Sequence, residues 1–262
     1  TDKMERHPFC KRPQNGRHII FPQLRTLCDL VRDQEMCRGK NECSELGTDP
    51  NNWDSQCLLP LPDWATDQVL IFSRAVDKFI EGYRDEALDL ISTIRSLELI
   101  NWSIEHGQMS GRHRKITLGK PKPAVVPEAL RDPVRSPRKY QETVFERDGY
   151  KCRYCGTKLI SQKMMKAFIS KLNSEQFAKG STNLTTHGII HITWPVADHV
   201  IPWNIGGRTN LYNLVSSCGP CNYGKDGYTC EELGIENPFK KPPITDSWNG
   251  LKTKLDEIKK IA

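Results

Sequence analysis

Apolar residues recur at the spacing of an α-helix through a long stretch in the first half of the chain. Two apolar stripes, separated by Gly82, fall between residues 62 and 99. A period near 3.6 residues places such positions on one face of a helix. We therefore predict a helical hairpin whose joint falls within residues 81–88. The apolar positions are Trp64, Val69, Leu70, Phe72, Ala75, Val76, Phe79, Ile80, Ala87, Leu88, Leu90, Ile91, Ile94, Leu97 and Leu99. A shorter pattern predicts one more helix over 22–36.

The second half of the chain mixes shorter helical patterns with one compact apolar run. Residues 138–149 and 157–180 have helical spacing, and residues 246–262 suggest a final amphipathic helix. The run 189–196, IIHITWPV, is rich in β-branched residues and predicts a strand. We therefore expect an α+β fold, in which a mainly α-helical N-terminal domain precedes a mixed C-terminal domain.

Proline content suggests where these two parts join. Residues 117–137 contain five prolines, which is typical of a linker. The predicted organisation is a helical domain at 1–116, a Pro-rich linker at 117–138, a second domain at 139–238 and a C-terminal tail with a helix at 239–262.

Charge and composition change this picture only slightly. The 262 residues carry a formal net charge of +6, and basic residues gather at 112–115 and 131–139. Each cluster suits either a solvated linker or a contact with phosphate, and the sequence leaves both readings open. No apolar run approaches the roughly 20 residues that a membrane span needs, and residues 1–16 lack the pattern of a secretory signal. We expect a cytoplasmic protein with no membrane partner.

The cysteines indicate a metal centre. Four of the ten form two C-x-x-C pairs, Cys152 with Cys155 and Cys218 with Cys221, separated by 62 residues. This arrangement suits a tetrahedral Cys₄ zinc site that holds structure, and four unmetallated thiols are the less favoured alternative. Cys230 lies outside both pairs and is interpreted as a spare thiol. The N-terminal cysteines have irregular spacing, so buried free thiols are favoured over a second zinc site: Cys10, Cys28, Cys37, Cys43 and Cys57.

Polar residues near the second pair form another constellation. Asp198, His199, Asn213 and Asn222 follow one another in the order of a strand, a loop, a second short strand and a helix. The loop contains the pair 206–207, Gly-Gly. Cys221 and Asn222 are adjacent on the predicted helix, where successive side chains differ by about 100°. One can therefore serve the zinc while the other faces the Asp-His pair.

These motifs together resemble the HNH endonuclease family of the zinc-knuckle type. The family pattern runs RDGYxCxYCG, DHxxPxxxGG, NL and CxxCN with a nearby lysine, and this chain has RDGYKCRYCG, DHVIPWNIGG, NL and CGPCNYGK. The intervals of fourteen residues from His199 to Asn213, and of nine from there to Asn222, are also typical of the family. The resemblance covers residues 140–225 and implies a ββα-metal fold. The segment between the first knuckle and the Asp-His pair is longer than in compact members.

The resemblance implies a role for each residue. His199 would be the general base that takes a proton from the attacking water, and Asn213 would hold its imidazole in orientation. Asp198 and Asn222 would ligate one Mg²⁺ or Mn²⁺ ion, because hard cations prefer oxygen ligands. Lys225 is either a contact to a flanking phosphate or a solvated lysine. Zn²⁺ would be the structural metal of the four cysteines.

The implied function is a metal-dependent DNA endonuclease. Its helical half would supply target choice or bind a partner protein, and members of the family often act in restriction or phage defence. Cutting both strands would need a homodimer or two sequential events, because one HNH site cuts one strand. The alternatives are an RNA-cleaving HNH nuclease and a non-catalytic zinc module that binds nucleic acid.

Overall fold

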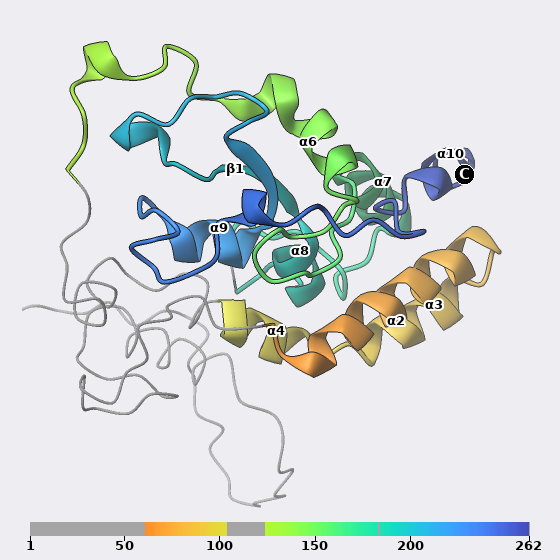
Figure 1. Ribbon diagram of the computed structural model, residues 1–262. Helices are drawn as coiled ribbons and strands as arrows, with labels where there is room; N and C mark the ends of the chain where they lie inside the picture. The colour runs from red at the N-terminus through yellow and green to blue at the C-terminus, as the bar shows by residue number, and fades with distance from the viewer. Residues whose placement is uncertain (1–60, 104–123, 183, 262) are drawn as a thin grey trace, which may run out of the picture.

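The computed structural model describes residues 61–103, 124–182 and 184–261. The predicted helix over 22–36, the basic run 112–115 and the five N-terminal cysteines lie outside these residues. The described part combines helices with a two-stranded sheet (Figure 1). Mixed helix and strand structure, with a helical region ahead of the sheet, is therefore present as predicted.

The predicted helical hairpin is confirmed. Helix α2 (Asp63–Ile80) turns at residues 81–83 into α3 (Arg84–Ser92), and α4 (Ser96–Trp102) follows. Gly82 has a φ of 91°, in the left-handed region that glycine adopts without strain, and so permits the tight reversal. Most of the predicted apolar positions of α2 are buried, namely Val69, Phe72, Ala75, Val76 and Phe79, whereas Trp64 and Ile80 are half-buried and Leu70 is exposed.

Helix α7 (Gln162–Leu172), which the apolar spacing also predicted, packs against this hairpin. The ring of Phe72 on α2 lies 5.3 Å from that of Phe168 on α7 and 5.1 Å from that of Phe177. Helix α10 (Leu255–Lys260), which is shorter than the predicted final helix, packs beside α7. The long segment between the knuckle and the Asp-His pair thus shares one hydrophobic core with the N-terminal hairpin.

The prediction of a strand over the whole run 189–196 was wrong. Gly188–Thr193 form helix α8, and the strand begins only at Pro195. Nδ1 of His187 accepts a hydrogen bond from the backbone N–H of Ile189 at 3.4 Å and so caps the helix. The helix is buried against α4, where the Gly188 N–H donates to Ser96 Oγ at 2.8 Å. A short run that is apolar on every side does not distinguish a buried helix from a buried strand.

The sheet consists of β1 (Pro195–His199) and β2 (Leu214–Cys218), paired antiparallel with Asp198 opposite Val215 and His199 opposite Leu214. Helix α9 (Gly219–Lys225) follows β2 directly. Ahead of the sheet in sequence lie the 3₁₀ turn η4 (Pro137–Tyr140) and helix α6 (Gln141–Arg147), which packs on both strands (Figure 1).

Asp148, at the end of α6, fastens that helix to β2. Its carboxylate is 1% exposed and accepts hydrogen bonds from Ser216 N at 2.7 Å and from Arg147 Nε at 2.8 Å. Arg147 in turn donates to the carbonyl oxygen of Leu214 at 2.7 Å. A buried carboxylate is stable only with such partners, so this pair fixes the sheet against α6.

The described part of the Pro-rich segment, residues 124–138, lies against the loop that follows β1. The segment contains η3 (Glu128–Leu130), and the loop contains η5 (Trp203–Ile205). The Trp203 indole N–H donates to the carbonyl oxygen of Asp132 at 2.8 Å, and Val126 N donates to Asn204 O at 2.9 Å. These residues, predicted as a linker, are therefore folded onto the strand-containing part, while the domain boundaries themselves stay a prediction.

The C-terminal segment forms two 3₁₀ turns, η6 (Pro238–Lys240) and η7 (Lys252–Lys254), before helix α10. Among the helices of the described residues, none has both the length and the apolar character that a membrane span requires.

Candidate active site and metal centre

Strands β1 and β2 and helix α9 bring the predicted site residues into one small region. Asp198 and His199 are the last two residues of β1, and Asn213 immediately precedes β2. Asn222 and Lys225 lie on α9. The sequence order of strand, loop, strand and helix is therefore a ββα unit in space.

The four cysteines of the two C-x-x-C pairs meet at one point. Their Sγ atoms all lie within 4.8 Å of one another, and those of Cys155 and Cys218 are 3.8 Å apart. Four sulfurs bound at about 2.3 Å to one tetrahedral zinc are separated from each other by about 3.8 Å. The cluster therefore has the dimensions of a Cys₄ site. Cys230, predicted as a spare thiol, is buried elsewhere with Val200 and Val215.

The electrostatics of the cluster also call for a cation. Burial opposes ionisation of the Cys152 thiol, but hydrogen bonds from Cys155, Cys218 and Cys221 outweigh it and hold its pKa well below the usual range. Burial and the hydrogen bond to Cys152 raise the pKa of Cys218 well above that range. The Cys218 and Cys221 thiols, whose pKa values are raised, therefore resist ionisation without a nearby cation. A divalent metal would supply the charge that lets all four thiols ionise and bind.

The first C-x-x-C turn, residues 152–156, is the first knuckle, and it forms hydrogen bonds directly with the sheet. Gly156 has a φ of 79°, and its N–H donates to Cys152 O at 2.9 Å, which closes the turn. Arg153 N donates to Ser216 O of β2 at 2.8 Å. The guanidinium of Arg153 also binds the carbonyl oxygens of Pro238 and Lys241. The knuckle therefore links β2 to the C-terminal segment.

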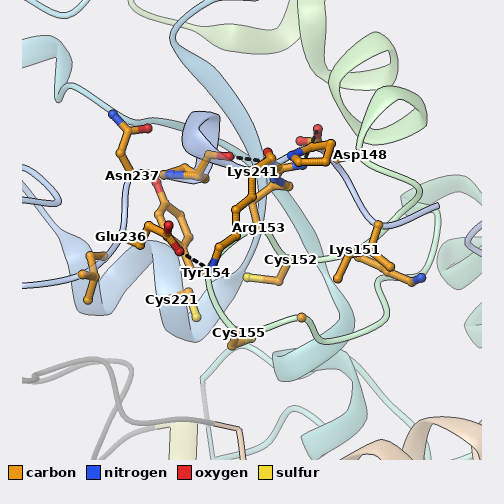
Figure 2. A pocket seen from close by; sticks show the side chains of 15 residues that line it. Asp148, Lys151, Cys152, Arg153, Tyr154, Cys155, Cys221, Glu236, Asn237 and Lys241 are labelled. Carbon is orange, nitrogen blue, oxygen red and sulfur yellow. Dashed lines mark hydrogen bonds and ion pairs between the residues drawn. The ribbon is translucent and has the colours of Figure 1, made fainter.

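A pocket of about 650 Å³ lies beside this knuckle, and Figure 2 shows Cys152, Cys155 and Cys221 gathered at one end of it. Residues 235–244 form much of its other wall. Neither Asp198 nor His199 lines it. The candidate chemistry therefore belongs to the ββα unit and not to this pocket.

Asp198 is buried among specific partners. Its Oδ2 accepts a hydrogen bond from the Tyr154 hydroxyl at 2.6 Å and lies 3.3 Å from Lys225 Nζ. Burial raises the pKa of the Asp198 carboxyl, and the Lys225 ammonium and the Tyr154 hydroxyl oppose that rise. Because Tyr154 lies between Cys152 and Cys155 in the sequence, a side chain of the first C-x-x-C pair directly contacts Asp198.

His199 is held by a residue that the sequence did not single out. Its Nε2 lies 2.9 Å from Thr209 Oγ1, and the Thr209 hydroxyl donates its proton to the carbonyl oxygen of Val134. Thr209 can therefore only accept from His199, so the imidazole carries its proton on Nε2 and its lone pair on Nδ1. Burial, together with the nearby Lys225 charge, lowers the pKa of His199 to about 4. At neutral pH the ring is a neutral base.

Asn213 binds the backbone of the loop between the strands. Its Oδ1 accepts from Ile201 N at 2.8 Å, and its Nδ2 donates to Ile201 O and Arg208 O, both at 2.9 Å. A Cβ on Gly207 would lie 1.8 Å from Ile201 O, so the tight loop requires glycine there. In this geometry Asn213 orders the loop, and the direct partner of the His199 ring is Thr209.

The two predicted site residues of α9 differ in how deeply they are buried. Asn222 is half-buried. Lys225 is fully buried, and its ammonium donates to the carbonyl oxygen of His199 at 2.8 Å. The alternative of a solvated lysine was therefore wrong, whereas a contact between Lys225 and a phosphate stays a prediction. As described, the lysine fixes the end of β1.

Sequence reasoning missed Tyr154, Thr209 and the upstream residues that contact Thr209. Asp132 accepts a hydrogen bond from Thr209 N at 2.9 Å through its Oδ2. Tyr154 stood in the family motif, so its position was visible although its partner was not. The contact between 132–134 and Thr209 spans more than seventy residues and has no signature in the local sequence.

A comparison with protein-family models gives a match to part of this chain. The family model described as HNH endonuclease matches residues 195–226, a span that contains β1, the loop, β2 and α9. Neither the curated proteins nor the solved structures contain a match. The match supports nuclease activity and nucleic-acid binding in general, and the cysteine cluster beside it can bind metal. Residues 195–226 thus match the HNH endonuclease family, the family that the sequence motifs resemble.

Proposed function

We propose that this protein is a metal-dependent endonuclease that hydrolyses phosphodiester bonds of DNA. The observation that carries the proposal is the position of the His199 ring: its Nε2 lies 2.9 Å from a Thr209 hydroxyl that itself donates to Val134 O, and the next residue back in the sequence is a buried carboxylate. A general base must be unprotonated at the working pH and held in one orientation. His199 meets both conditions.

Asp198 and Asn222 are the proposed ligands of a catalytic Mg²⁺ or Mn²⁺ ion. A carboxylate and an amide oxygen are the donor types that these hard cations take. Oδ2 of Asp198 is already bonded to Tyr154 and Lys225, and Oδ1 accepts no hydrogen bond from the described residues. The donor types thus suit such an ion. When bound, the metal would stabilise negative charge on the phosphate and the leaving oxygen.

The residues of the chain supply the remaining parts of the mechanism. His199 Nδ1 accepts a proton from the attacking water, and the Thr209 hydroxyl keeps the ring in the tautomer that makes this possible. Lys225 holds the strand end by binding His199 O, and Asn213 holds the loop. The zinc knuckle acts only through structure, because four thiolates leave no open position for water. Restriction or phage defence in the cytoplasm is the proposed context.

The test of this function is a cleavage assay with the whole protein. We expect plasmid DNA to be cut with Mg²⁺ or Mn²⁺, and we expect cutting to stop in excess EDTA and to resume when Mg²⁺ is restored. Single-stranded RNA serves as the competing substrate. Cleavage of RNA with intact plasmid would replace the DNA assignment by the RNA alternative. Binding of DNA without any cleavage would support the non-catalytic zinc module instead.

Removing the Tyr154 hydroxyl is expected to weaken metal binding at Asp198. Loss of a hydrogen bond to a metal-ligating side chain commonly costs about 10–100-fold in metal affinity. Tyr154→Phe should therefore raise the Mg²⁺ concentration that gives half-maximal cleavage by about tenfold or more. Tyr212→Phe is the matched control, because Tyr212 is 89% exposed. Equal Mg²⁺ dependence for both variants would argue against Asp198 as the ligand that Tyr154 orients.

A further inference from the structure

The Pro-rich segment reaches the active site through Asp132 and Val134. The Asp132 carboxylate accepts from Val134 N at 2.8 Å and from Thr209 N at 2.9 Å, and the Thr209 hydroxyl donates to Val134 O. The segment is therefore only two hydrogen bonds away from the His199 ring. The residue after Val134 is Arg135, and the residue before Thr209 is Arg208. Both arginines are thus placed at the edge of the site by the same set of bonds.

Arg135 and Arg208 are exposed cations, and the charge of Arg208 also acts on the Asp132 carboxylate. Both side chains are exposed, and neither forms an ion pair with a described residue. The guanidinium of Arg135 lies 5.2 Å from the centre of the Trp203 ring, which limits its orientations. Arg131 lies over the same ring at 5.1 Å. Trp203 thus supports a cationic group directly beside the loop that carries Thr209.

The charge around these two arginines is predominantly positive. The loop 200–212 contains no acidic residue. In residues 124–140 the acidic residues are Glu128 and Asp132, and the Asp132 carboxylate is already bonded to two backbone N–H groups. Arg138 and Lys139 add two more exposed cations.

We propose that Arg135 and Arg208 bind backbone phosphates of the DNA strand that is presented to His199, and that the Pro-rich segment is therefore part of the substrate-binding surface. A guanidinium fits a phosphate with two parallel hydrogen bonds, and an aromatic ring behind it keeps the fork in place. The proposal rests on the proposed function of the His199 site. It extends the substrate surface beyond residues 195–226, to a segment that precedes the zinc knuckle.

The test measures DNA binding without chemistry. Whole protein carrying His199→Ala is titrated against a short labelled DNA duplex in Mg²⁺ at several salt concentrations, with and without Arg135→Gln or Arg208→Gln. Each substitution should weaken binding by about tenfold. Each should also lower the slope of log affinity against log salt by about 1, as the loss of one phosphate contact requires. The matched control is Arg74→Gln, an exposed arginine on α2 far from the site in sequence.

The lysine variant of Arg135 and the Arg74→Gln control distinguish phosphate binding from other effects of the substitutions. Arg135→Lys retains the charge and should retain the salt slope, whereas Arg135→Gln should not, so a packing effect of the arginine on Trp203 is separated from phosphate binding. Affinity and salt slope equal to those of the Arg74→Gln control would overturn the proposal. The nuclease assignment is tested separately, by measuring Mg²⁺-dependent DNA cleavage with protein in which His199 is intact. Intact cleavage with unchanged binding would therefore remove the arginine proposal alone.

Discussion

Replacing His199 with alanine is expected to reduce DNA cleavage by a factor of about 10²–10⁴, the usual contribution of a general base. The imidazole is half-buried and points its Nε2 proton at Thr209, so its removal takes away the base without taking away a core side chain. The melting temperature and the zinc content should stay close to those of the wild type. Cleavage rates under single-turnover conditions measure the effect.

Two substitutions of Thr209 test whether the orientation of the His199 ring matters, in addition to its presence. Thr209→Ser keeps the hydroxyl and should retain most activity. Thr209→Val removes the hydroxyl at similar size and should lower kcat by about tenfold or more with a smaller effect on KM. A His199→Ala protein that cuts as fast as the wild type would remove His199 from the mechanism. Equal losses in the serine and valine variants would show that packing at Thr209 matters and its hydroxyl does not.

Replacing Cys152 with serine is expected to abolish the zinc centre and to unfold the strand-containing part before it affects chemistry as such. Structural zinc contributes about 10–16 kcal/mol in zinc-finger peptides, which is as large as the whole stability of a typical domain, about 5–15 kcal/mol. The knuckle also orients Asp198 through Tyr154 and pairs with β2 through Arg153. Zinc content should fall by about one equivalent per chain, with loss of cooperative melting and of cleavage.

Cys230→Ser is the matched control for the zinc prediction. Cys230 is buried like Cys152 but lies outside the cluster of four thiols. Its substitution should leave the zinc content unchanged and cost little more than a small packing loss. Identical zinc content in the wild type and the Cys152→Ser protein would contradict the Cys₄ assignment.

Sequence patterns predicted the parts of the fold that depend on local spacing. The hairpin of α2 and α3 and helix α7 followed from apolar periodicity, because each buries one face and exposes the other. The two C-x-x-C pairs predicted a cluster that the structure brings together. The prediction of a strand failed at α8, because nearly all of this short helix is buried and it therefore has no wide polar face that would reveal a helical period.

The sequence predicted which residues form the site, but it did not predict most of the contacts between them. Motif spacing identified Asp198, His199, Asn213 and Asn222, whose roles stay proposals. It could not show that Thr209 forms a hydrogen bond with the His199 ring, that Tyr154 donates a hydrogen bond to Asp198 or that Lys225 is buried. Each of these facts depends on chain segments that meet only after folding. A hydroxyl or an ammonium group has many partners available, and local sequence does not choose among them.

The shared core of the hairpin and the inserted helices restricts how this protein could be rearranged. A recognition module on a flexible tether can be exchanged for another without disturbing the catalytic unit. Here α2 packs on Phe168 and Phe177, and α4 packs on the helix that leads directly into β1. A replacement module would have to present an equally shaped apolar face to α7 and α8. Without one, those helices would expose their buried side to water, and the strand that carries Asp198 and His199 would lose the support on which it rests.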